Sequence, residues 1–217
     1  MNVNNLHKQY KKNGYVLIKN FYDKTFCKTL DTYCKLRFQN LKAFMEDDRI
    51  EYRESTDGTL DDGDVLGAGS FYADPFTEAM LINNKDFIKK VSKKDIEATY
   101  SYWRYYRPGN ELEYHTDRND CIVSATICVG YDVSNVDKDY NWKIFMRSKE
   151  KDIGIEMHPG DMVIYNGLDL PHWREKFKGR YQSQVFIHYS DIPIIKDLKD
   201  GRNRLGLPLC FKKKITR

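Results

Sequence analysis

The spacing of apolar residues divides the chain near residue 96, because a helical period gives way there to short strand-like runs. In the first part, Tyr15 to Ile18 reads as a short strand. A helix is predicted from about Lys24 to Phe44, with Asp23 as its N-cap and apolar or long side chains at steps of three and four residues. A second helix is predicted over Asp74 to Lys90, with Pro75 in its first turn.

From Ile96 onward, short runs of β-branched and aromatic residues alternate with Gly, Pro, Asn and Asp, which is typical of strands and turns. The strands are expected at Thr99 to Tyr106, Tyr114 to Asp117, Ile122 to Tyr131, Trp142 to Arg147, Ile153 to Met157, Asp161 to Tyr165 and Tyr181 to Tyr189. Many short strands after a helical segment predict a mainly β protein, a jelly roll supported by N-terminal helices. We expect one domain over residues 1–217, with helical support and a lid loop in 1–95, a jelly-roll core in 96–191 and a basic tail in 192–217.

Composition narrows the class of protein. The chain has 217 residues and 41% hydrophobic content, enough for one sizeable core. Its apolar runs are far shorter than the roughly 20 residues of a membrane helix, and its start lacks a signal-peptide pattern. The odd number of cysteines, without close CxxC pairs, favours free thiols. We therefore expect a cytoplasmic protein that does not insert into membranes, and the sequence predicts no oligomeric state.

The charges are unevenly distributed around a formal net charge of +4. Residues 46–64 hold nine acids against Arg49 and Arg53, which indicates a solvated, mobile loop. Residues 201–217 contain basic side chains and no acid, and they read as a solvated terminus, with nucleic-acid contact as the less favoured alternative. These basic residues are Arg202, Arg204, Lys212, Lys213, Lys214 and Arg217.

Two histidines and a carboxylate form the candidate chemical site. In a strand, side chains two residues apart point to the same face, so His115 and Asp117 are expected to converge on one ion. His172 lies 57 residues after His115, just after a predicted strand, and it is expected to supply a third ligand. Two histidines and one carboxylate are the ligand set of non-haem Fe(II) oxygenases, which leave open positions on the metal.

Several ordered motifs extend this pattern along residues 13–191. They are Asn13-Gly14-Tyr15-Val16-Leu17-Ile18-Lys19-Asn20-Phe21, Tyr106-Arg107-Pro108-Gly109, His115-Thr116-Asp117, Pro159-Gly160-Asp161, His172 and Gly179-Arg180. With these motifs the chain resembles the Fe(II)- and 2-oxoglutarate-dependent dioxygenases, in their prolyl-4-hydroxylase-like branch. The resemblance implies a double-stranded β-helix of the cupin-like kind, with Fe(II) held by His115, Asp117 and His172. It also implies 2-oxoglutarate and O2 as cosubstrates, with Arg180 and Tyr106 binding 2-oxoglutarate.

Several cations are candidates to hold the distal carboxylate of 2-oxoglutarate. Arg180 lies eight residues after His172, whereas the family places its basic residue nine or ten residues after that histidine, where Gln182 stands here. Competing cations are Arg104, Arg118 and Arg174. His188 and His158 are expected to be structural.

The resemblance implies hydroxylation of a substrate C–H bond with release of succinate and CO2. A small molecule or a peptide is the expected substrate, a peptidyl proline is the family-level choice, and nucleic acid is disfavoured. The stretch from Glu46 to Gly69 is expected to form a lid over the cavity mouth. The rival interpretations are a non-catalytic jelly-roll binding module and a structural zinc protein, with Cys121 as a candidate fourth ligand.

Overall fold

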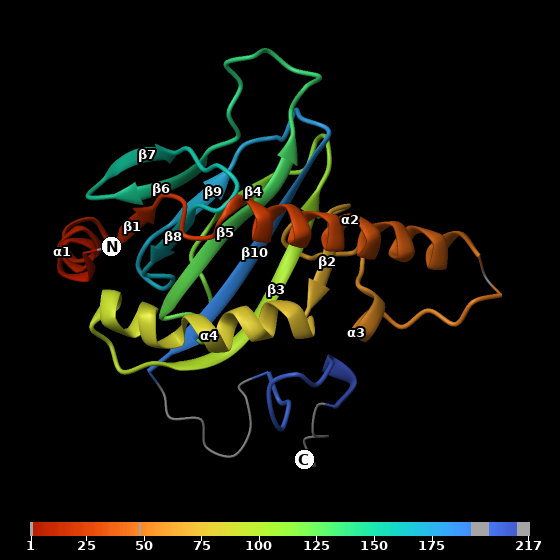
Figure 1. Ribbon diagram of the computed structural model, residues 1–217, viewed down its shortest axis with the longest axis horizontal. Helices are drawn as coiled ribbons and strands as arrows, with labels where there is room; N and C mark the ends of the chain where they lie inside the picture. The colour runs from red at the N-terminus through yellow and green to blue at the C-terminus, as the bar shows by residue number, and fades with distance from the viewer. Residues whose placement is uncertain (1, 48, 192–199, 212–217) are drawn as a thin grey trace.

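The computed structural model describes residues 2–47, 49–191 and 200–211, and these form two antiparallel sheets with helices against one of them (Figure 1). The larger sheet has the strand order β1-β8-β5-β10-β3-β2, and the smaller has the order β4-β9-β6-β7. The strands are β1 (Tyr15–Ile18), β2 (Gly69–Tyr72), β3 (Glu97–Tyr106), β4 (Leu112–His115), β5 (Val123–Asp132), β6 (Ile144–Ser148), β7 (Lys151–Ile155), β8 (Met162–Tyr165), β9 (His172–Arg174) and β10 (Tyr181–Ser190). Two facing antiparallel sheets with this topology form a jelly roll, as the sequence predicted.

The helices cover the outer face of the larger sheet. They are α1 (Val3–Asn13), α2 (Lys24–Glu46), the short α3 (Glu54–Asp57) and α4 (Pro75–Ser92), and a 3₁₀ turn, η1, follows at Leu209–Phe211. In Figure 1, α2 and α4 run across the front of β5, β10 and β3. The carboxylates of Asp23 and Asp74 accept hydrogen bonds from the N–H groups of Phe26 and Phe76, so both predicted N-termini are capped.

Five elements were not predicted from the sequence. They are helix α1, the one-turn helix α3, the 3₁₀ turn η1, and strands β2 and β9, which have only four and three residues. Strands this short carry too few alternating positions to be recognised by pattern. No helix among the described residues is both long and apolar enough to cross a membrane.

The charged segments are more ordered than their composition indicated. Asp62, in the acidic segment, is buried against Arg104 rather than solvated. Arg202 is fully buried, and its guanidinium is 2.6 Å from Glu78 and 2.7 Å from Asp200. The expectation of a solvated basic terminus is therefore wrong for Arg202, because an acid on α4 pairs with it. Lys212, Lys213, Lys214 and Arg217 lie outside the described residues.

The larger sheet separates two different interiors. Its helix-facing side forms an apolar core with residues of α1, α2 and α4. The side that faces the smaller sheet carries two smaller apolar clusters, around Val163 and Ile144 and around Trp142 and Phe177. Polar side chains of β3, β5, β9 and β10 are buried on this inner side, including Arg104, Thr126, Arg174 and Gln184. Because polar groups are costly to bury, a polar interior indicates a ligand site.

Candidate active site

His115 and His172 meet on neighbouring strands of the smaller sheet. Strand β4 pairs with β9 so that His115 is directly opposite His172, and the two ring centroids are 4.3 Å apart. His172 is buried, while the His115 side chain retains 34% exposure. The antiparallel register therefore brings together two residues that lie far apart in the sequence.

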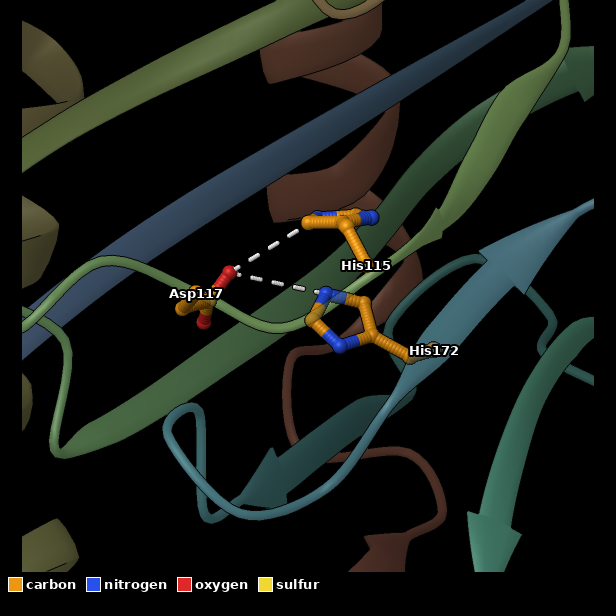
Figure 2. Close-up of side chains that lie close together, drawn as sticks. All are labelled: His115, Asp117 and His172. Atoms are coloured by element: carbon orange, nitrogen blue, oxygen red, sulfur yellow. Dashed lines mark ion pairs between the residues drawn. The ribbon is translucent and has the colours of Figure 1, made fainter.

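Asp117 joins the two histidines from a loop and not from their sheet (Figure 2). Strand β4 covers Leu112–His115, so the expected strand over Tyr114 to Asp117 is placed two residues too late, and the two-residue alternation does not place Asp117. Its N–H donates to the carbonyl oxygen of Gly167 at 2.8 Å instead. Its Oδ1 atom then lies 3.5 Å from Nε2 of His172 and 3.9 Å from Nε2 of His115.

Gly167 makes the close approach of this loop possible. A Cβ atom at Gly167 would lie 2.1 Å from the carbonyl oxygen of Cys121 and 2.5 Å from Oδ2 of Asp117. Both distances are shorter than atoms can approach, so a side chain at this position would displace Asp117.

Backbone carbonyls fix the orientation of both imidazole rings. Nδ1 of His115 is 2.8 Å from the carbonyl of Glu113, and Nδ1 of His172 is 3.0 Å from the carbonyl of Leu170. A carbonyl only accepts, so Nδ1 carries the hydrogen in each ring and Nε2 keeps its lone pair. Burial lowers the pKa of His172, which favours the neutral ring. The candidate ligand atoms of His115, Asp117 and His172 all lie within 4.8 Å of one another, and this donor set suits Fe(II) with open coordination positions.

Arg174 and Tyr106 each contribute a buried polar atom that has no hydrogen-bond partner in the described part of the chain. Arg174 follows His172 by two residues in β9, so both side chains project from the same face of that strand. Its guanidinium donates to the carbonyl of Trp142 at 2.9 Å and stacks on that indole, but its Nε has no hydrogen-bond partner among the described residues. The hydroxyl of Tyr106 is likewise buried and unpartnered there. A buried guanidinium without a carboxylate is costly, so these two donors fit an anionic ligand such as the distal carboxylate of 2-oxoglutarate.

The other candidate cations are placed differently. Arg180 is 63% exposed, lies 3.8 Å from the carboxylate of Asp132 and does not reach the triad, because it precedes β10 in an exposed turn. Arg104 is buried on the inner face, but Asp62 and Asp64 already pair with it at 2.6 and 2.8 Å. Arg118 is exposed. Gln182 is buried, and its amide donates to Gln184.

A cleft of about 810 Å³ opens onto the triad. His115 and Asp117 line it together with residues of the expected lid segment, among them Thr59, Asp64 and Leu66. The rest of its wall is polar and aromatic, formed by Tyr72, Tyr100, Tyr102, Arg104, Arg118, Glu111, Glu113 and His188, among others. Its volume lies within the roughly 300–1,000 Å³ of small-molecule pockets.

His188 and Ser124 belong to the site although the sequence analysis did not place them there. Ser124 Oγ donates to Oδ2 of Asp117 at 2.6 Å and contacts Nδ1 of His188 at 2.9 Å. Burial lowers the pKa of His188 to about 4. The sequence does contain a pattern that indicates this position for His188. In the predicted strand Tyr181 to Tyr189, Gln182, Gln184 and His188 occupy alternate positions and therefore share one polar face.

Cys121 does not complete a closed site around the two ligand histidines. Its Sγ groups with Asp117 and His188, and not with His115 and His172. Burial raises the pKa of this thiol to about 12, which disfavours the thiolate that zinc requires. The geometry therefore favours three protein ligands over four at the triad.

Comparison with solved structures identifies the class of fold. A scan against protein-family models finds no match, and a search of curated proteins also finds none. Among solved structures, the chain has the fold of 2-oxoglutarate–Fe(II) oxygenases, including prolyl-4-hydroxylases. The similarity lies in the fold, since the sequence identities are low.

Individual neighbours cover most of the chain. A prolyl-4-hydroxylase from Pseudomonas putida matches with a TM-score of 0.65 and 15% identity, over 88% of this chain and 100% of that one. HygX from Streptomyces hygroscopicus, with nickel, 2-oxoglutarate and hygromycin B bound, matches with a TM-score of 0.65 and 8% identity, over 89% of each chain. A prolyl hydroxylase from Trichoplax adhaerens, in complex with a peptide fragment of hypoxia inducible factor, matches with a TM-score of 0.59 and 12% identity, over 87% of this chain and 89% of that one.

Proposed function

We propose that the protein is an Fe(II)- and 2-oxoglutarate-dependent dioxygenase that hydroxylates a C–H bond. His115, Asp117 and His172 would hold the iron, and Arg174 with Tyr106 would hold the distal carboxylate of 2-oxoglutarate. When bound, iron and 2-oxoglutarate supply the oxidising chemistry, in which O2 is consumed and succinate and CO2 are released. The fold shared with oxygenases of this kind supports the proposal.

The observation that carries the proposal is a buried cation close to the triad, with no acidic partner among the residues that the structure describes. Arg174 is fully buried and is two residues from His172 on the same face of β9. An arginine offers parallel donors that match a carboxylate, and burial strengthens such a pair. Arg174 therefore replaces Arg180 as the proposed anchor, because Arg180 is exposed and its charge lies near Asp132.

The chain's own residues would orient the iron and the cosubstrate. The Nε2 atoms of His115 and His172 face Asp117, since backbone carbonyls hold both Nδ1 atoms. Tyr106 is packed edge-on against Trp142, with ring centroids 4.8 Å apart, which fixes its ring. Because these side chains are held in place before the cosubstrate binds, little reorganisation is needed on binding.

For the substrate, a small molecule or a peptide is the class that we propose. The solved structure of HygX contains hygromycin B, and that of the Trichoplax adhaerens enzyme contains a peptide. The cleft beside the triad has a volume suited to either kind of ligand. A peptidyl proline remains the choice that the family resemblance favours.

The direct test is turnover of 2-oxoglutarate by the metal-free purified protein after addition of Fe(II). We expect slow, Fe(II)-dependent formation of succinate even without substrate. The Asp117→Ala variant should form none, because it lacks the only carboxylate of the triad. Wild-type levels of succinate from Asp117→Ala, or a wild-type protein that retains zinc and forms no succinate, would contradict the proposed function.

A further inference from the structure

The two carboxylate oxygens of Asp117 have different surroundings. Oδ1 faces the metal-binding side, 3.5 Å from Nε2 of His172 and 3.9 Å from Nε2 of His115. Oδ2 points the other way and accepts a hydrogen bond of 2.6 Å from the hydroxyl of Ser124. The carboxylate is thus turned so that a single oxygen faces the two histidines.

Ser124 is held in turn by His188. The two residues are directly opposite in the pairing of β5 with β10, and Ser124 Oγ is 2.9 Å from Nδ1 of His188. Ser124 has one hydroxyl hydrogen and donates it to Asp117, so Nδ1 of His188 must be the donor in the second contact. This leaves Nε2 of the neutral ring as an acceptor, and Nε2 is buried without a partner among the described residues. A buried acceptor is easier to leave unpaired than a buried N–H, which agrees with this tautomer.

The ring of His188 is itself fixed by its neighbours. It stacks on Tyr100 at a centroid distance of 4.6 Å and on Tyr102 at 5.5 Å, with interplanar angles of 30° and 10°. The backbone of Gly167 lies beside the same hydrogen bond, since a Cβ atom there would be 2.5 Å from Oδ2 of Asp117 and 2.9 Å from Oγ of Ser124. The orientation of Asp117 is therefore determined at Oδ2, by groups that do not face the metal.

We propose that Ser124 and His188 are positioning residues that make Asp117 a one-oxygen metal ligand. If both oxygens of Asp117 bound the ion, the triad would occupy four positions instead of three. Binding of 2-oxoglutarate through two atoms and of O2 through one requires three open positions on an octahedral ion. The hydrogen bond to Oδ2 keeps that oxygen occupied and so preserves the third open position. This inference rests on the metal site of the proposed function.

The test compares two buried serines that each donate to an aspartate. Ser183 donates to Oδ1 of Asp31 at 2.9 Å, on the helix-facing side of the same sheet, so Ser183→Ala is a matched control for Ser124→Ala. The measurements are Co(II) affinity and the visible absorption spectrum of the Co(II) protein, which reports coordination number. We expect Ser124→Ala to bind Co(II) roughly 10- to 100-fold more weakly, with an altered spectrum, because loss of an outer hydrogen bond to a ligand has about this effect. Ser183→Ala should bind as the wild type does.

Two substitutions at His188 separate positioning from packing. In His188→Asn, the amide nitrogen can replace Nδ1 as the donor to Ser124, whereas His188→Leu keeps bulk and has no donor. We expect His188→Asn to bind Co(II) within about threefold of the wild-type affinity. His188→Leu should bind Co(II) roughly 10- to 100-fold more weakly, as Ser124→Ala does. Wild-type affinity and spectrum in both Ser124→Ala and His188→Leu would overturn the inference while leaving the proposed function intact. A wild-type protein that binds no Co(II) would instead overturn the metal site itself.

Discussion

The two faces of the larger sheet are built from alternate residues of the same strands, yet they differ in chemistry. On β5 and β10, most helix-facing residues are apolar and belong to the main core: Ala125, Ile127, Val129, Val185, Ile187 and Tyr189. The residues between them face the smaller sheet, and they include Ser124, Thr126, Gln184 and His188, all buried. One face therefore supplies apolar burial, and the other places polar groups around the triad.

The polar groups on the two faces also differ in how they are paired. On the helix side, Asp31 accepts hydrogen bonds from Ser183 and Tyr181 and pairs with Lys35. On the inner side, Tyr106 Oη, Arg174 Nε and His188 Nε2 are buried without partners among the described residues. Paired polar groups hold a fold together, whereas unpaired ones near a candidate metal site are available to a ligand.

The largest expected effect tests the apolar face. Ile127→Ala should lower the free energy of unfolding by about 2–5 kcal/mol, since it leaves a cavity in the core. Its neighbour Thr126 accepts a hydrogen bond from Gln184 on the inner face, and Thr126→Ala should cost only about 1 kcal/mol. Urea unfolding measures both changes. Equal losses from the two variants would contradict the assignment of stability to the helix-facing side.

A second prediction concerns the loop that places Asp117. Gly167→Ala should weaken Co(II) binding roughly 10- to 100-fold, because its Cβ would push against Asp117 and Cys121. Gly63→Ala is a suitable control for the loss of a glycine, since Gly63 is not among the glycines with positive φ and no heavy atom outside its chain neighbours lies within 4 Å of a Cβ built there. Isothermal titration of the metal-free proteins gives the affinities. Unchanged binding by Gly167→Ala would mean that Asp117 does not depend on this contact.

The third and smallest effect is a pH dependence of stability on the inner face. Burial lowers the pKa of His188 to about 4, whereas its pKa in the unfolded chain is about 6.5. Between pH 6.5 and pH 4, the unfolded chain therefore binds a proton at this residue that the folded chain does not. Folded-state stability should therefore fall as pH falls through this window, by at most about 1.4 kcal/mol per pH unit from this residue. His188→Asn removes that contribution, so the metal-free variant should lose less stability than the wild type between pH 6.5 and 5. Equal losses of stability in the wild type and in His188→Asn would contradict a buried, neutral His188.

The sequence allowed the fold class and the three candidate ligands to be predicted, because the strand runs and the HxD motif are local patterns. The rule that residues two apart share a strand face does not apply to His115 and Asp117. Strand β4 ends at His115, so Asp117 reaches the site through the Gly167 contact, which depends on tertiary structure. The same two-residue rule does place Arg174 beside His172, but β9 has only three residues and was not recognised as a strand.

The family resemblance implies Arg180 as the cation that holds 2-oxoglutarate, and we propose Arg174 in its place. Arg180 precedes β10 and is exposed, while Gln182 is the first inward-facing residue of that strand. Burial and pairing of the candidate arginines are properties of the folded chain. Only the fold shows that Arg104 is paired with acids and that Arg174 has no acidic partner among the described residues.

The most direct test of the central claim is 2-oxoglutarate binding to the anaerobic Fe(II) protein, in the wild type, Arg174→Met and Arg180→Met. Methionine fills the space of a buried arginine without its charge, so Arg174→Met should fold at least as stably as the wild type. We predict that Arg174→Met weakens 2-oxoglutarate binding on the order of 100-fold, through loss of a charge-assisted pair, and that Arg180→Met changes it by less than about twofold. Unchanged binding by a folded Arg174→Met protein would contradict the account, as would a large loss in Arg180→Met alone.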